Sequence, residues 1–371
     1  MTNSDTASSE RLQSLDIFRG LTMFLLVCET AGVWSALRGL SFDNPVWHKV
    51  VTHLTHHEWN GLHFWDLVQP FFMFIVGVAM AFSMAKRTER GSTWAQSLRH
   101  IVYRCFMLLM FGVGLHCIYA RGLCWELWNV LSQLSVTILI AFLIMQWSAK
   151  MQVAISLLLL VATELAFRLC TIEGYDEPFV IGKTFGSWTD MILMGKTSSG
   201  GWLAINCIPT AAHTIWGVVA GQWLLSSRTT SSKLRQLLLS GVVLLAVGYG
   251  LDWSGVTPII KRICTSSFVM ASGGWCLLTL AFFYWLVDIR GCKRWGFVFI
   301  VVGMNPIFIY LFSESIGRQW FNGTVAIFTH GWLQPFGLSE ATLAILTASA
   351  VLALEWSLCY WLFKRKILIK I

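Results

Sequence analysis

The sequence predicts an all-α integral membrane protein, with about ten transmembrane helices around a polar cavity. Hydrophobic residues make up 56% of the chain and charged residues only 12%, and the mean hydropathy is +0.64. Apolar runs of about 20 residues, the length that crosses a bilayer core, recur along the chain. Such runs are expected to be helices, because lipid offers no hydrogen-bond partner to an exposed backbone.

The first apolar run differs from a secretory signal, because it carries charged residues, Asp16, Arg19 and Glu29, and follows a polar leader. Many of the 20 tryptophans lie near the ends of the runs, as in an interfacial aromatic belt. The expected spans are Ile17–Ser35, Phe64–Met84, His100–Ala120, Val130–Ser148, Met151–Leu169, Ile205–Leu225, Leu234–Trp253, Ser267–Asp288, Gly296–Glu314 and Glu340–Phe363.

Basic residues give the expected orientation. Ten spans put both termini on one side, and 18 of the 27 Lys and Arg residues then fall on that side and 9 on the other. Since cytoplasmic loops carry the excess of basic residues, both termini are predicted to be cytoplasmic. The expected location is a bacterial inner membrane. The net charge of +8 is thus a topology signal, and its spread over several short loops argues against nucleic-acid binding.

The domain organisation is expected to be simple. Residues 1–13 are predicted to form a disordered cytoplasmic leader, and residues 14–371 a single membrane domain. The loop Cys170–Ala204 lies on the outer side and is too long for a simple connection, so it is expected to fold over the outer mouth. The ten cysteines include no CxxC pair and are expected to be packing residues, with a Cys117–Cys124 disulfide as a minor alternative.

Three spans combine proline with a strong polar residue. Proline removes a helix hydrogen bond, and broken helices are tolerated in membranes where they line a cavity. Each pair could be a simple kink. Together with Glu29, Asp66 and Glu314 in or near spans, they favour a polar cavity. The three pairs are Gln69–Pro70, Asn206 with Pro209, and Asn305–Pro306.

Five of the nine histidines lie within the 16 residues from His48 to His63, a segment predicted to face the periplasm. Imidazole is the side chain best suited to moving a proton near neutral pH. Metal binding is the weaker alternative, because no Cys or second His pair stands at typical ligand spacing, and no metal is expected. His56 and His57 are the better candidates for chemistry.

Several long motifs resemble one family. The stretches Ser14–Gly20 (SLDIFRG), His56–Leu62 (HHEWNGL) and Asp66–Gly77 (DLVQPFFMFIVG) are similar to those of the heparan-α-glucosaminide N-acetyltransferase family. The similarity runs from about Leu12 to Ser315 and also includes Lys261–Phe268, Val287–Gly291 and Gly303–Pro306.

The resemblance implies a transmembrane acetyltransferase, which moves an acetyl group from cytosolic acetyl-CoA to an amino sugar across the membrane. The family's active-site histidine falls on His56, three residues before Trp59. Its catalytic-site asparagine falls on Glu29, which is a departure from the family pattern. A family arginine in the fourth span falls on Gln133, another departure.

The expected catalytic set is His56 with Glu29 or Asp66 orienting it. His56 takes a proton from the acceptor as the acceptor attacks the thioester, or His56 attacks the thioester and becomes acetylated itself. Asn60 and Asn305 are expected to stabilise the oxyanion, and Trp59 to stack on the sugar. The expected substrate-binding set is Trp59, Asn60, Lys261, Ser267, Asn305 and Glu314.

The CoA phosphates are expected to bind Arg19, Arg99 and Arg104 at the cytoplasmic mouth. Gln133 and Asn206 complete the expected cofactor-binding set. The expected partners are acetyl-CoA, a sugar acceptor and the lipid bilayer, with a homodimer left open. A proton-coupled transporter also uses broken helices and intramembrane carboxylates, and an O-acyltransferase acting on envelope glycan is the other alternative.

Overall fold

The computed structural model of the chain describes residues 12–40 and 44–369. This part of the chain is helical and contains no named strand, only an isolated bridge between Asn60 and Ile260. The α-helices are α1 (Gln13–Thr30), α2 (Val33–Gly39), α3 (Pro45–Thr52), α4 (Val68–Glu89), α5 (Trp94–Ala120), α6 (Val130–Ile144), α7 (Ala149–Arg168), α8 (Phe185–Met194), α9 (Cys207–Leu225), α10 (Thr230–Trp253), α11 (Ser266–Phe283), α12 (Phe297–Gly303), α13 (Pro306–Phe312), α14 (Asn322–Leu333) and α15 (Glu340–Lys364).

Every predicted span falls on a helix or a pair of helices, so the all-α prediction is confirmed. Within the described residues, six helices are long and apolar enough to cross a membrane, or up to eight if two bent pairs each form one span. The predicted ten are therefore not reached. α6 has only 15 residues, and α9 is buried along most of its length, so its composition is that of an internal helix.

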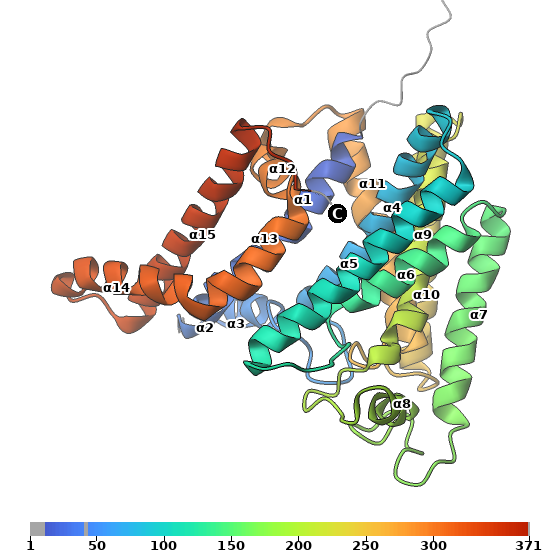
Figure 1. Cartoon of the computed structure of the whole chain (residues 1–371), viewed down its shortest axis with the longest axis horizontal. Coiled ribbons are helices and arrows are strands. Elements are labelled where there is room, and N and C mark those ends of the chain that lie inside the picture. Colours follow the sequence, from blue (N-terminus) through green and yellow to red (C-terminus); the bar gives the residue numbers. More distant parts are fainter. Residues whose placement is uncertain (1–11, 41–43, 370–371) are drawn as a thin grey trace, which may run out of the picture.

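The beginning of α1 and the end of α15 lie on the same side of the molecule, the upper side in Figure 1. α2, α3 and α8 lie on the opposite side. This arrangement agrees with an even number of crossings between the two ends. The assignment of the first side to the cytoplasm stays a prediction, and residues 1–11 of the expected leader lie outside the described residues.

The prolines break the helices at only one of the three expected places. At Asn305–Pro306 the segment ending with α12 meets the segment beginning with α13 at 67°. Pro70 and Pro209 instead lie in the first turns of α4 and α9, where a backbone N–H has no helical partner and its loss costs little. A break that the sequence did not predict lies at Gly32, whose φ of +85° ends α1 and turns the chain by 58° into α2.

Glycines allow α4 and α9 to approach closely. A Cβ added to Gly77 would lie 2.1 Å from the Thr214 carbonyl oxygen, and one added to Gly217 would lie 2.1 Å from the Phe74 carbonyl oxygen. Small residues at such contacts let membrane helices pack backbone to backbone. The contact fixes α4, which begins at the functional site, against the buried helix α9.

We expect Gly77→Ala to lower the melting temperature of the detergent-solubilised protein. Its methyl group would overlap the α9 backbone, and overpacking typically costs about 1–3 kcal/mol. Gly114→Ala on α5 is the matched control, because its methyl group would meet nothing within 4 Å. The control is expected to be neutral or slightly stabilising, since alanine favours helices over glycine. Equal melting temperatures for the two variants would contradict this view of the α4–α9 contact.

Candidate active site

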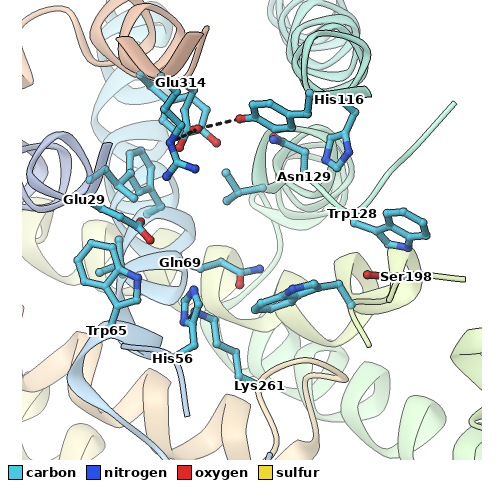
Figure 2. Close-up of a pocket in the computed structure, with 18 of the residues that line it drawn as sticks. Glu29, His56, Trp65, Gln69, His116, Trp128, Asn129, Ser198, Lys261 and Glu314 are labelled. Atoms are coloured by element: carbon cyan, nitrogen blue, oxygen red, sulfur yellow. Dashed lines mark hydrogen bonds and ion pairs between the residues drawn. The ribbon is translucent and has the colours of Figure 1, made fainter. Parts of the chain in front are cut away.

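A cavity of about 590 Å³ opens between α1, α4, α5, α6 and the π-helix Ser313–Phe321, here η5. Three loops complete it, which carry His56, Ser198 and Lys261 (Figure 2), and Trp202 of the second loop also lines it. Its volume is typical of small-molecule sites. We call His56, Asp66 and Lys261 the floor of the cavity, and Glu29 and Glu314 its acidic wall.

Asp66 organises the floor. Its carboxylate is fully buried. One oxygen accepts hydrogen bonds from the backbone N–H groups of His57, at 3.1 Å, and His63, at 2.9 Å. The other lies 2.9 Å from His56 Nδ1. Asp66 occupies a short 3₁₀ turn just before α4, where an acidic side chain can accept from the free N–H groups of the incoming chain. The loop from His56 to His63 is therefore wound around one carboxylate.

This contact decides the tautomer of His56. Nδ1 faces an acceptor-only carboxylate, so it carries the hydrogen and donates it, which leaves the Nε2 lone pair free. Lys261 Nζ lies 3.1 Å from the same Nδ1 and 3.5 Å from the Asp66 oxygen. Since a protonated Nδ1 cannot accept, the partner of Lys261 in this tautomer is Asp66. The floor thus joins a base, its orienting carboxylate and a cation.

Burial lowers the pKa of His56 to about 4, and the Lys261 charge adds to this lowering, while Asp66 opposes it. Burial also lowers the pKa of Lys261, again against the pull of Asp66. The His56 imidazole is therefore neutral at physiological pH, which is the form that a general base or nucleophile requires.

The acidic wall faces this floor. Glu314 accepts a hydrogen bond from the Tyr119 hydroxyl at 2.8 Å and pairs with Arg318 at 3.2 Å. Glu29 projects from α1 into the cavity above His56 (Figure 2), with no hydrogen bond or ion pair to the described residues. Gln69, at the start of α4, also lines the cavity and hydrogen-bonds Gln133 of α6.

The long loop Cys170–Ala204, called the outer loop after its predicted side, contributes part of the cavity lining. Ser198 and Trp202 both line it, and the Trp202 ring lies edge-on to His56 with 5.5 Å between ring centroids. Asp190 of α8 holds this loop by accepting from Trp128 Nε1, at 2.7 Å, and from the Ala204 N–H, at 3.0 Å. Burial raises the pKa of Asp190 to about 6, against these two hydrogen bonds.

A second set of contacts ties the loop to α5. Glu126 accepts from His116 Nδ1 and from Lys196 Nζ, each at 2.5 Å. These two bonds hold the pKa of Glu126 below its usual range although partial burial raises it. The nearby Cys117 and Cys124 are free thiols with 3.9 Å between their sulfur atoms.

The structure brings part of the expected site together. Glu29, His56, Lys261 and Glu314 line the cavity, and Asp66 lies directly behind His56. Gln133 does not line the cavity. It hydrogen-bonds Gln69, which does, and this contact takes the place of the expected phosphate contact.

Four of the six expected substrate contacts, Trp59, Asn60, Ser267 and Asn305, lie outside the cavity lining. Asn60 is exposed on its loop. The Trp59 indole donates to the Phe179 carbonyl at 2.8 Å and packs in an apolar cluster under the outer loop. The Asn305 amide is used by the chain's last described residues, because it donates to Ile367 O and accepts from the Ile369 N–H. The expected oxyanion and stacking roles of these residues are therefore corrected.

Ser267 and Asn206 also have structural contacts. Ser267 Oγ donates to the Pro258 carbonyl at 2.7 Å, within the loop that presents Lys261. Asn206 Nδ2 donates to the Arg262 carbonyl at 2.7 Å in the same loop. Asn206 is thus placed to position the floor, and not near the expected CoA arginines.

The three arginines lie toward the other end of the helices. Arg19 donates to the Gly303 carbonyl and pairs with Asp16, three residues before it on α1, at 2.8 Å. Arg99 is exposed and Arg104 half-buried on α5. Arg99 and His116 of this helix are separated by roughly 25 Å of axial rise.

The sequence did not point to Trp202, Tyr119, His116 or Trp128, all of which line the cavity. Their segments lie far from His56 along the chain, and an aromatic residue near a span end is as typical of an interfacial belt as of a site.

These features define an all-helical integral membrane protein with a carboxylate-supported histidine in a polar cavity. A model of the DUF5009 family, described as a domain of unknown function, matches residues 11–198, about half of the chain. The chain belongs to this family.

Two relatives carry an informative name, heparan-alpha-glucosaminide N-acetyltransferase. The Homo sapiens protein is 26% identical over 85% of this chain and 55% of its own length. The Mus musculus protein is 35% identical over 29% of this chain and 14% of its own length. The chain thus spans about half the length of the human relative, and the similarity agrees with the family that its motifs resemble.

We expect Asp66→Ala to open the histidine loop, because it removes the acceptor of two backbone N–H groups and leaves Lys261 buried without its carboxylate. Breaking a buried ion pair costs about 3–5 kcal/mol. Hydrogen exchange followed by mass spectrometry should show faster exchange in the peptide covering His57 and His63. Asp176→Ala, at an exposed position of the outer loop, is the control. Unchanged exchange in the Asp66 variant would show that this carboxylate does not hold the loop.

Proposed function

We propose that this protein is a membrane-embedded acetyltransferase, which uses acetyl-CoA as the donor and an amino sugar of glucosamine type as the acceptor. The observation that carries the proposal is the His56–Asp66 pair, with the free Nε2 of a neutral imidazole in a polar cavity. The names of the two relatives support the same reaction class.

In the proposed reaction, His56 Nε2 takes a proton from the acceptor nitrogen as that nitrogen attacks the thioester carbonyl. The tetrahedral intermediate then collapses, the carbon–sulfur bond breaks, and the leaving CoA thiolate takes up the proton that His56 removed from the acceptor. Asp66 holds the His56 ring in the tautomer that this step needs. A positioned general base contributes about 10²–10⁴ to the rate. In the covalent variant, Nε2 attacks the thioester carbonyl and the carbon–sulfur bond breaks to release the CoA thiolate. The acceptor nitrogen then attacks the acetyl-imidazole, and the neutral imidazole leaves.

The cavity suits an acceptor with both a cationic or polar edge and an apolar face. The Glu29 carboxylate is free to bind an amine or a hydroxyl group, and Glu314 lies on the same wall. Trp65 and Trp202 flank His56, with ring centroids 6.4 and 5.5 Å from its own. Aromatic faces beside carboxylates are typical of sites that bind sugars by stacking and hydrogen bonding.

The donor is proposed to enter from the opposite side. Arg19, Arg99 and Arg104 lie toward the end of the helices away from His56, where cationic side chains could bind the CoA phosphates. The pantetheine arm would then run between the helices toward His56. In this view the histidine loop faces the periplasm of a bacterial inner membrane.

A proton-coupled transporter remains the second candidate, because Glu29 and Glu314 each lie in one of the two bent helix pairs. Acetyl-CoA separates the two candidates, since a ligand that binds the folded state raises the melting temperature. The acetyltransferase should be stabilised by acetyl-CoA and a transporter should be indifferent to it. An O-acyltransferase acting on envelope glycan would share the donor and differ only in the acceptor.

We expect His56→Ala to reduce acetyl transfer from labelled acetyl-CoA to amino sugars by at least about 10²-fold, because the variant lacks the general base. Acetyl-CoA should still stabilise this variant, as the proposed phosphate site lies elsewhere. His48→Ala, an exposed position in the same segment, is the control and should keep normal activity. Normal acetyl transfer by His56→Ala would contradict the proposed mechanism. Loss of transfer in His57→Ala alone would show that His57, and not His56, is the general base.

We expect the acid limb of kcat/KM to have its midpoint near pH 4, the pKa of His56, instead of near its ordinary value of 6.5. Lys261→Met removes a positive charge that lowers this pKa, so the midpoint should move to higher pH. Activity at pH 5 should then fall relative to activity at pH 8. Lys183→Met, an exposed lysine of the outer loop, should leave the profile unchanged. A midpoint that shifts downward in the Lys261 variant would contradict the proposed electrostatics.

A further inference from the structure

A buried carboxylate outside the cavity has no partner. Glu355, in the middle of α15, is 1% exposed, and neither of its oxygens has a hydrogen bond to the described residues. Among the described residues, no basic side chain pairs with Glu355, and the Arg318 guanidinium is paired with Glu314. An ionisable group inside a membrane protein marks a functional site by default, because leaving it unpaired is costly.

A second unpaired oxygen faces the same place. Asn322, at the start of α14, donates from Nδ2 to the Thr30 carbonyl at 2.7 Å. This bond fixes which end of the amide is the oxygen. The oxygen, Oδ1, is buried and has no partner among the described residues.

The two oxygens converge beside Gly317 of η5. A Cβ built on Gly317 would lie 3.1 Å from Glu355 Oε1 and 3.7 Å from Asn322 Oδ1. It would also lie 3.7 Å from the Phe312 carbonyl oxygen. Because Gly317 has no side chain, there is room next to three oxygens. They belong to Glu355 of α15, Asn322 of α14 and Phe312, the residue before η5. Irregular turns of the π type are frequent at functional sites.

The donor set decides between a proton and a metal ion. A proton on Glu355 would provide one hydrogen-bond donor and leave other buried acceptors unpaired. A small hard cation can bind carboxylate, amide and carbonyl oxygens at once, as Na⁺ does at unwound helices in transporters. A single carboxylate balances one positive charge, and the described residues contain no group of three His, Cys, Asp or Glu side chains that could hold a multivalent metal. We propose that Glu355, Asn322 and the backbone beside Gly317 form a binding site for a monovalent alkali cation, with Na⁺ as the fitting ion.

The site lies directly behind the acidic wall. Asn322 is tied to Thr30, the neighbour of Glu29, and Gly317 lies between Glu314 and Arg318 in sequence. A cation there would hold α15, η5 and the end of α1 together. Its binding would thereby stabilise the segments that present the acidic wall to the cavity.

The test is the melting temperature of the full-length, detergent-solubilised protein in NaCl and in choline chloride at equal ionic strength. A ligand that binds only the folded state stabilises it as its concentration rises. We expect a rise of a few degrees with Na⁺ that saturates. Glu355→Gln should abolish the rise. Gly317→Ala should weaken Na⁺ binding at least tenfold, because its methyl group would fill the space beside Glu355 Oε1. Glu340→Gln, at an exposed position on the same helix, should respond like the wild type.

Equal melting temperatures of the wild type in the two salts, or a full Na⁺ response in Glu355→Gln, would overturn the proposal. If Glu355→Gln does not fold, equilibrium binding of ²²Na⁺ to the wild type and to Gly317→Ala decides the matter. Saturable binding that is weakened by Gly317→Ala supports the site. Absence of binding to the wild type shows that Glu355 holds a proton only.

Discussion

The site depends on one buried charge, the carboxylate of Asp66. A carboxylate without water must be surrounded by donors, and here the donors are two backbone N–H groups, the His56 ring and the Lys261 ammonium. Satisfying Asp66 therefore winds the histidine loop, selects the His56 tautomer and brings in Lys261, which lies 205 positions from His56 along the chain. Its place just before α4 adds the favourable end of that helix's dipole. Removing any one donor would leave the charge less compensated, so these elements form one cooperative unit.

Asp66 and its donors can be held rigidly only if α4 and the loop that carries Lys261 are themselves held in place. α4 is fixed by the glycine contact with α9, which brings two backbones together without intervening side chains. The Lys261 loop is fixed on its other side by Asn206 and Asp252, which bond the Arg262 carbonyl and the Ile259 N–H. The polar residues at the start of α9 and the end of α10 thus position the loop that carries Lys261, although they do not line the cavity. This explains why a strong polar residue in a span need not be a ligand-binding residue.

The sequence predicted the helices and the floor well, and the rest of the cavity poorly, for physical reasons. Apolar length reports what faces lipid, so it located long outer helices such as α10. The buried α9 and the short α6 are not among the described helices that are long and apolar enough to cross a membrane, so their prediction as spans is not confirmed. The motif around His56 and Asp66 is local, within ten residues, and could be read directly. Asn305 and Trp59 have the right chemistry, but neighbours distant in sequence already use their polar groups. Trp202 and Tyr119 reach the cavity from other segments, and no local pattern reveals such convergence.

The charge distribution bears on how a proton would move in the proposed reaction. Burial and Lys261 hold the pKa of His56 near 4, so a free imidazolium beside Lys261 would not accumulate. A weak base of this kind acts best when proton transfer accompanies attack on the thioester, because the acceptor nitrogen becomes acidic only as its new bond forms. The proton then has to leave the floor. We propose that Glu29, on the facing wall and without a side-chain partner among the described residues, relays it to the leaving thiolate. A carboxylate at this position, where the related family has an asparagine, thus fits a floor whose histidine is kept neutral.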